Sequence, residues 1–281
     1  MKPGLVLEGG SRQTIFSAGV LDAMMDAHIE FPYMAGVSAG AHAAANYITG
    51  QRGRFRHIIM PTKLQQGKKA HLFLDGIYKE CHALHFDAAN GDIPFDFEKF
   101  FNSDVECEIA VTNCETGRVE FKSEKKDRDG LLTLISASCA LPMIFPNVSI
   151  GNSHYVDGCV TAPIPFERAF EKGCDKVVAV STHYPGEIVT DFTKYKAILV
   201  PLYKHKFPNL FRALMVRYRR YQKMFARMEE LEKQGSLFLI RPERDLCDLF
   251  ETNLKKLDDS YYHGFDCARY CMDRLKAFLE I

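Results

Sequence analysis

The chain has 281 residues, with 36 Lys and Arg against 36 Asp and Glu, so its formal net charge is zero. This balance gives no electrostatic reason to expect nucleic acid or an acidic polymer as a partner. A hydrophobic fraction of 47% is enough for a large core, and residues 1–281 are expected to form a single domain. No apolar run approaches the roughly 18 residues of a membrane-spanning helix, and the first apolar stretch is too short for a signal peptide.

Nine cysteines are scattered along the chain without a Cys-x-x-Cys pair, so no zinc ribbon or thioredoxin-like motif is present. Cys81, His82 and His85 are close in sequence, but such neighbours without further ligands are usually solvated surface residues. We therefore predict no metal ion and no cofactor. Reduced thiols and the missing export signal predict a cytoplasmic protein, with peripheral contact to the inner membrane face as an extension of that prediction.

Short apolar runs alternate with longer amphipathic runs, which predicts a three-layer α/β/α sandwich with a mostly parallel central sheet. The C-terminal part is expected to be helical from about residue 206. The predicted strands are residues 5–7, 33–37, 107–112, 118–122, 177–181 and 236–240. The predicted helices are residues 14–27, 38–47, 131–140, 209–233 and 252–279.

The first turn of the chain contains Gly9, Gly10, Ser11 and Arg12, between a predicted strand and a predicted helix. Such a turn can form a concave nest of backbone N–H groups, and two N–H groups aimed at one point stabilise an oxyanion. A dinucleotide site is less well supported, because the Gly-x-Gly-x-x-Gly spacing is absent. A purely structural strand–helix turn is the other open interpretation.

The pattern Gly-x-Ser-x-Gly occurs at residues 36–40, again between a predicted strand and a predicted helix. Gly36 and Gly40 allow a sharp turn, which exposes Ser38 at a helix N-terminus where N–H groups favour negative charge. Chance could supply the bare pattern, and a strand–turn–helix packed by small residues could be structural. The flanking elements nevertheless match the nucleophile elbow of a serine hydrolase, with Ser38 as the nucleophile.

The order of residues along the chain does not by itself identify the catalytic partner of Ser38. A Ser–Asp–His triad could use Asp157 and His263, but several strands precede the nucleophile in the α/β-hydrolase fold. Only 37 residues precede Ser38 here. Asp157 followed by Gly158 is, taken alone, most often a turn.

Together these segments resemble the patatin-like phospholipases, specifically their bacterial branch. The matching blocks are the strand and glycine turn from residue 5, the Gly-x-Ser-x-Gly segment, and residues 137–142 followed by 155–158 and 164–165. The resemblance implies a lipid acyl hydrolase of the phospholipase A, lysophospholipase or esterase type. It implies that Ser38 is the nucleophile, that Asp157 is the general base in a dyad without histidine, and that the amides around Gly10 and Ser11 form the oxyanion hole.

A carboxylate of ordinary pKa is a weak base for this chemistry, so we expect the pKa of Asp157 to be raised by burial. The chain departs from the family where the turn usually reads Gly-Gly-Gly-x-Arg-Gly. Ser11 and Thr14 replace glycines, Arg12 comes one place early, and Cys159 replaces the second glycine after Asp157. A catalytically weak or inactive lipid-binding protein is therefore the alternative.

Residues 206–228 contain seven Lys and Arg residues and no acid, with apolar side chains at helical spacing. The simpler interpretation is a surface helix that packs its apolar stripe on the core. The functional interpretation is an interfacial helix whose bases approach anionic lipid head groups. The predicted partners are thus a lipid or acyl-ester substrate and a membrane surface, and no nucleic acid.

Overall fold

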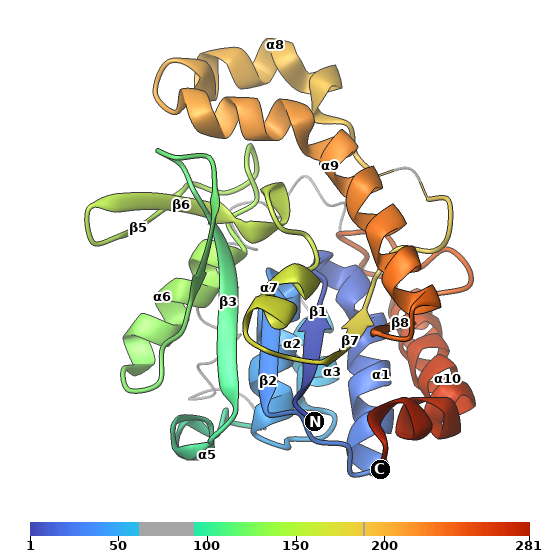
Figure 1. Cartoon of the computed structure of the whole chain (residues 1–281). Helices are drawn as coiled ribbons and strands as arrows, with labels where there is room; N and C mark the ends of the chain where they lie inside the picture. Colours follow the sequence, from blue (N-terminus) through green and yellow to red (C-terminus); the bar gives the residue numbers. More distant parts are fainter. Residues whose placement is uncertain (62–92, 188) are drawn as a thin grey trace.

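A computed structural model describes residues 1–61, 93–187 and 189–281 (Figure 1). The neighbouring Cys81, His82 and His85 fall outside these residues. Within the described part of the chain, no helix is both long and apolar enough to cross a membrane.

Eight strands form one sheet. Five strands run parallel in the order β3, β2, β1, β7, β8, and the other three are antiparallel additions in which β4 and β6 pair with β3 and β5 pairs with β6. The strands are β1 (Pro3–Leu7), β2 (Tyr33–Val37), β3 (Glu106–Asn113), β4 (Val119–Lys122), β5 (Val148–Ile150), β6 (Ser153–Asp157), β7 (Lys176–Val180) and β8 (Leu237–Ile240).

Helices cover both faces of the sheet. The longer ones are α1 (Ile15–Asp26), α2 (Ala39–Ile48), α6 (Arg128–Ser138), α9 (Pro208–Lys233) and α10 (Leu254–Leu279). The shorter ones are α3 (Arg54–Ile59), α5 (Phe97–Asn102), α7 (Phe166–Glu171) and α8 (Lys196–Leu199). Short 3₁₀ turns are η1 (Ser11–Thr14), η3 (Gly158–Val160) and η4 (Phe192–Tyr195), and η5 (Val200–Lys204) is a short π-helix.

Side chains alternate between two cores along the central strands, as strand geometry requires. Leu5 and Leu7 of β1 face the core built with α1, α2, α6 and α10, whereas Val6 faces the core built with α7 and the end of α9. The three-layer α/β/α sandwich with a mostly parallel sheet is therefore confirmed. The predicted strands and the long helices are present, with ends shifted by at most three residues.

Sequence patterns missed β5 and β6, and this pair matters most for the site. Both β4 and β6 pair with the second half of β3, so they lie on its opposite edges. The strand β6 lies on the same edge of β3 as β2 and continues the pairing beyond the end of β2. Val37, the last residue of β2, pairs with Ala110, and Asp157, the last residue of β6, pairs with Val111. The end of β6 is therefore brought next to Ser38.

Candidate active site

Ser38 lies on a sharp turn between β2 and α2. Its backbone has φ 55° and ψ −129°, a strained conformation that few non-glycine residues adopt. Close backbone packing fixes the turn: a Cβ on Gly36 would collide with the Gly40 carbonyl, and one on Gly40 would lie 2.5 Å from the Leu7 and Glu8 carbonyl oxygens. This is the geometry of a nucleophile elbow.

The backbone N–H of Ser38 is held by a buried serine on α6. Ser38 N–H donates to Ser138 Oγ at 2.8 Å, and Ser138 Oγ donates to the Ala110 carbonyl at 2.7 Å. Ser138 is fully buried. One hydroxyl thus joins the elbow to β3, and the Ser38 amide is already occupied.

Asp157 is buried at the end of β6, and the Ser38 hydroxyl lies close enough to its carboxylate to lower its pKa. Asp157 Oδ1 also accepts the Cys159 N–H at 2.8 Å. Its backbone is fixed by the Ala140 carbonyl and by Thr112 Oγ1, both at 2.9 Å. Burial raises the pKa of Asp157, and the Cys159 N–H and the nearby Ser38 hydroxyl offset only part of that effect.

The glycine turn keeps its special backbone despite the substitution at Ser11. Gly10 has φ 142° and Ser11 has φ 47°. Gly9 packs directly on Ser38. Among the described residues no hydrogen bond occupies the N–H groups of Gly10 and Ser11. Arg12 differs from the expectation: it does not line the cavity around Ser38, and its N–H donates to the Leu249 carbonyl at 3.1 Å.

Ser38 and Asp157 open into a cavity of about 360 Å³. Most of its wall is apolar and comes from three parts of the chain, namely the segment after α6, the segment before α8, and the loop before α10. The apolar lining residues are Leu141, Pro142, Met143, Ile144, Phe145, Pro163, Val189, Phe192, Tyr195, Leu249 and Phe250.

A buried polar cluster that sequence patterns missed forms another wall of the cavity. Glu8 accepts hydrogen bonds from Ser181 Oγ at 2.6 Å and Thr182 N–H at 2.8 Å, and its Oε1 lies 2.9 Å from His183 Nδ1. The Tyr221 hydroxyl lies 3.0 Å from the same nitrogen. Burial lowers the pKa of His183, but the carboxylates of Glu8 and Glu187 together raise it more, so the net shift is upward.

The position of this cluster follows from the topology. Glu8 follows β1 and His183 follows β7, and β1 and β7 are parallel neighbours. The carboxyl ends of parallel strands meet at one edge of a sheet, where sites in α/β folds are found. This rule could have indicated the Glu8–His183 cluster from the sequence, but only if β1 and β7 were known to be neighbours.

Two arginines of α9 point toward the site and away from solvent. Arg217 Nε donates to the Cys159 carbonyl at 3.0 Å, and Arg220 Nη1 donates to the Val160 carbonyl at 3.3 Å. Both carbonyls belong to η3, the turn that directly follows Asp157. Helix α9 therefore braces the turn that directly follows Asp157.

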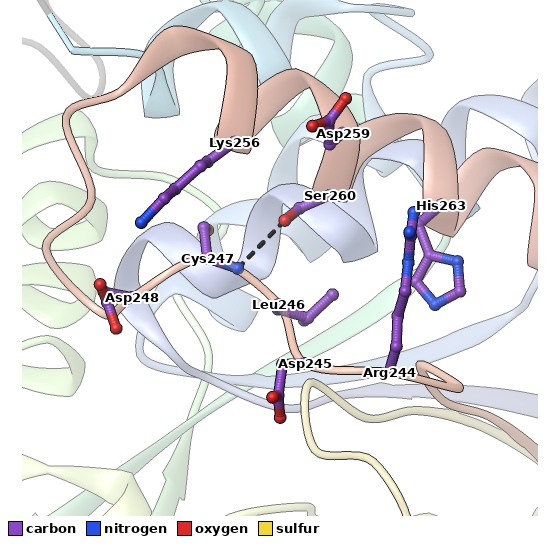
Figure 2. Close-up of a pocket in the computed structure, with 9 residues that line it drawn as sticks. All are labelled: Arg244, Asp245, Leu246, Cys247, Asp248, Lys256, Asp259, Ser260 and His263. Carbon is purple, nitrogen blue, oxygen red and sulfur yellow. Dashed lines mark hydrogen bonds between the residues drawn. The ribbon is translucent and has the colours of Figure 1, made fainter.

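His263 is not brought to Ser38. It lies on α10 in a second pocket of about 260 Å³, formed with residues 244–248 (Figure 2). Its Nε2 accepts the Glu243 N–H at 3.1 Å. The alternative triad through His263 is inconsistent with this arrangement, since His263 does not line the cavity that contains Ser38 and Asp157.

Comparisons with known proteins assign two regions. The profile of the family described as "Patatin-like phospholipase" matches residues 5–170, and that of a "Domain of unknown function (DUF6363)" matches residues 207–280. The uncharacterized protein YjjU of Escherichia coli K12 is 28% identical over 185 residues, which are 63% of this chain and 51% of that protein. The chain thus spans about half the length of this curated relative.

Among solved structures, VipD from Legionella pneumophila is similar in fold. The superposition has a TM-score of 0.50 with 12% sequence identity, and it covers 97% of this chain and 67% of that chain. At this identity the likeness concerns the fold alone.

Proposed function

Because this chain belongs to the patatin-like phospholipase family, as its motifs predicted, we propose that it hydrolyses carboxylic ester bonds of lipids through a Ser38–Asp157 dyad. The observation that carries the proposal is that Ser38, on its strained turn, and the buried Asp157 carboxylate line the same cavity side by side. The apolar cavity beside this pair suits an acyl chain.

In the proposed reaction, Asp157 removes the proton of Ser38 while Oγ attacks the ester carbonyl carbon. The N–H groups of Gly10 and Ser11 stabilise the resulting oxyanion. The tetrahedral intermediate collapses, the ester C–O bond breaks, and protonated Asp157 gives its proton to the leaving alcohol. Water then attacks the acyl-enzyme, with Asp157 again as the base, and releases the fatty acid and free Ser38.

The raised pKa of Asp157 supports its role, because a carboxylate with higher proton affinity is a better base near neutral pH. The Cys159 N–H still stabilises the ionised form, so the carboxylate can exist in this buried place.

The proposal is tested with a panel of p-nitrophenyl esters, phospholipids and lysophospholipids, assayed on wild type, Ser38→Ala and Asp157→Asn. We expect measurable turnover for wild type and a loss of at least about 10³-fold in both variants, as for a catalytic unit. His263→Ala is the matched control and keeps full activity, because His263 lies in the other pocket.

A serine-directed fluorophosphonate separates catalysis from mere lipid binding. Labelling of wild type that disappears in Ser38→Ala supports an active nucleophile. Lipid binding without labelling or turnover favours the alternative, a patatin-fold protein that binds lipids without hydrolysing them.

We further propose a cytoplasmic protein that contacts the membrane peripherally, in part through residues 206–228. The described cysteines are all free thiols, which suits a reducing compartment. Within α9, Arg212, Arg219 and Lys223 are exposed and available for anionic head groups, whereas the exposed Arg227 pairs with Glu230. Nucleic acid is not part of the proposal.

A further inference from the structure

We propose that residues 194–206, here called the tip, form the surface on which the protein docks to an anionic lipid bilayer. The tip includes the end of η4, all of α8 and η5, and the two residues that follow η5. It lies at the top of the molecule in Figure 1, beside the first half of α9. The inference rests on the proposed function in that docking would bring lipid to the cavity of Ser38.

Large apolar side chains on the tip face solvent. Tyr195 is 42% exposed, Ile198 is 54% exposed and Leu202 is 49% exposed. They are three and four residues apart, so they share one side of the continuous helical segment. Leu199 of the same segment is fully buried against the core under α9. The tip is thus anchored on one side and presents an unpartnered apolar strip on the other.

Positive charge surrounds this strip. Lys194, Lys196, Lys204 and Lys206 are exposed, and none has a carboxylate within ion-pair distance among the described residues. From residue 192 to residue 228 the sequence has no Asp or Glu, although the whole chain has equal numbers of acids and bases. An apolar strip among unpaired lysines complements a surface with anionic head groups above hydrocarbon.

The tip also adjoins the mouth of the cavity. Tyr195 lines the cavity that contains Ser38, so the apolar strip continues into its wall. The Tyr203 hydroxyl accepts the N–H of Met143 at 3.0 Å, and Met143 also lines the cavity. A lipid that leaves a bilayer under the tip therefore meets an apolar path toward Ser38.

Helix α9 adds little to this apolar surface, with Val216 as its exposed large apolar side chain. Its stripe is buried, and Arg217 and Arg220 are turned toward η3. The buried residues of the stripe are Leu210, Ala213, Leu214, Tyr221, Met228 and Leu231. The exposed bases of α9 extend the positive surface, while insertion into the bilayer belongs to the tip.

The test measures co-sedimentation with vesicles of phosphatidylcholine, with and without phosphatidylglycerol. All proteins carry Ser38→Ala, so that no lipid is hydrolysed. Two variants address the tip. One combines Ile198→Ser with Leu202→Ser, and the other combines Lys194→Gln, Lys196→Gln, Lys204→Gln and Lys206→Gln. Tyr270→Ser is the matched control, because Tyr270 is 86% exposed but lies on α10.

We expect the Ser38→Ala protein to bind phosphatidylglycerol vesicles at least about tenfold more tightly than pure phosphatidylcholine vesicles. The apolar variant should weaken binding to phosphatidylglycerol vesicles by about tenfold or more, and the lysine variant should abolish the preference. The Tyr270→Ser control should bind as before. Absent vesicle binding, or equal binding by both tip variants and the control, overturns the proposal.

A second measurement separates this proposal from the proposed function. With Ser38 intact, the tip variants should hydrolyse a soluble short-chain p-nitrophenyl ester as fast as wild type, since none of the changed residues lines the cavity. Tip-dependent vesicle binding by a protein without esterase activity refutes the proposed function and supports docking. Esterase activity combined with vesicle binding that the tip variants do not weaken supports the proposed function and refutes docking through the tip.

Discussion

Replacing Ser138 by alanine should damage both the stability and the activity of the protein. The hydroxyl of Ser138 accepts the Ser38 N–H and donates to the Ala110 carbonyl, and both contacts are buried. Alanine keeps the shape of the core but leaves both backbone groups without a partner. A water molecule could replace the lost hydroxyl only if the packed core opened to make room for it.

The size of the effect follows from these two hydrogen bonds. A net contribution of about 1 kcal/mol each gives a loss of about 2 kcal/mol, and the desolvation penalty of the orphaned N–H and carbonyl raises this toward about 4 kcal/mol. For a domain of this size, that loss lowers the melting temperature by at least roughly 4 °C. Ser38 also loses the hydrogen bond that holds its strained φ, so kcat should fall by about ten- to a hundredfold.

Ser17→Ala is the control. Ser17 is equally buried, but its Oγ has no hydrogen-bond partner among the described residues, so the same substitution there should cost nothing. Urea denaturation gives the free energy of unfolding of each variant, and ester hydrolysis gives kcat. Equal stability and equal kcat for Ser138→Ala and Ser17→Ala would refute the reasoning.

Further predictions concern pH and the two glycine turns. The acid limb of kcat/KM should have its midpoint above 3.8, the ordinary pKa of aspartate, because burial raises the pKa of Asp157; a midpoint at 3.8 contradicts this assignment. Gly40→Ala should lower the free energy of unfolding by about 1–3 kcal/mol through overlap with backbone oxygens, and an unchanged urea midpoint would argue against that packing. Ser11→Gly should change kcat far less than the ~10²-fold loss of an oxyanion donor, since Ser11 already has positive φ; a larger gain would show that serine impairs the turn. His183 has a raised pKa when folded, so its ionic contribution to stability is complete below about pH 6.5 and is lost as pH rises through that raised value. The stability gap between wild type and His183→Gln should therefore shrink toward alkaline pH, and a gap that grows contradicts the pairing with Glu8.

The part of the site that is local in sequence could be predicted from the sequence. A glycine two residues before Ser38 and another two residues after it, between an apolar run and a run of small residues, suffice to indicate an elbow. Asp157 could not be found in this way, because Asp-Gly alone indicates a turn, and only the family resemblance singled it out. Its place beside Ser38 depends on β6 pairing with β3 beyond the end of β2, a long-range contact that short strands do not signal.

Side chains that reach the site from distant segments were missed for a related reason. Helical spacing predicted an amphipathic helix here, but it did not identify most of the side chains that α9 buries. It also could not tell that Arg217 and Arg220 reach the carbonyls of η3 while other arginines stay in solvent. Long flexible side chains beside an apolar stripe can turn either way. Likewise, His183 follows a correctly predicted strand, but its meeting with Glu8 depends on the order of strands in the sheet.

The hydrogen bonds around the elbow narrow the choice of oxyanion donors. The Ser38 N–H is taken by Ser138, and the Arg12 N–H is taken by the Leu249 carbonyl. The N–H groups of Gly10 and Ser11 have no hydrogen-bond partner in the described structure. Ser11 adopts a positive φ in this turn although it is not a glycine. Left-handed backbone at a non-glycine residue costs about 1–2 kcal/mol of conformational energy but removes no N–H group. We therefore infer that serine at position 11, where the family has glycine, lowers the stability of the protein but leaves the N–H donors of the turn in place.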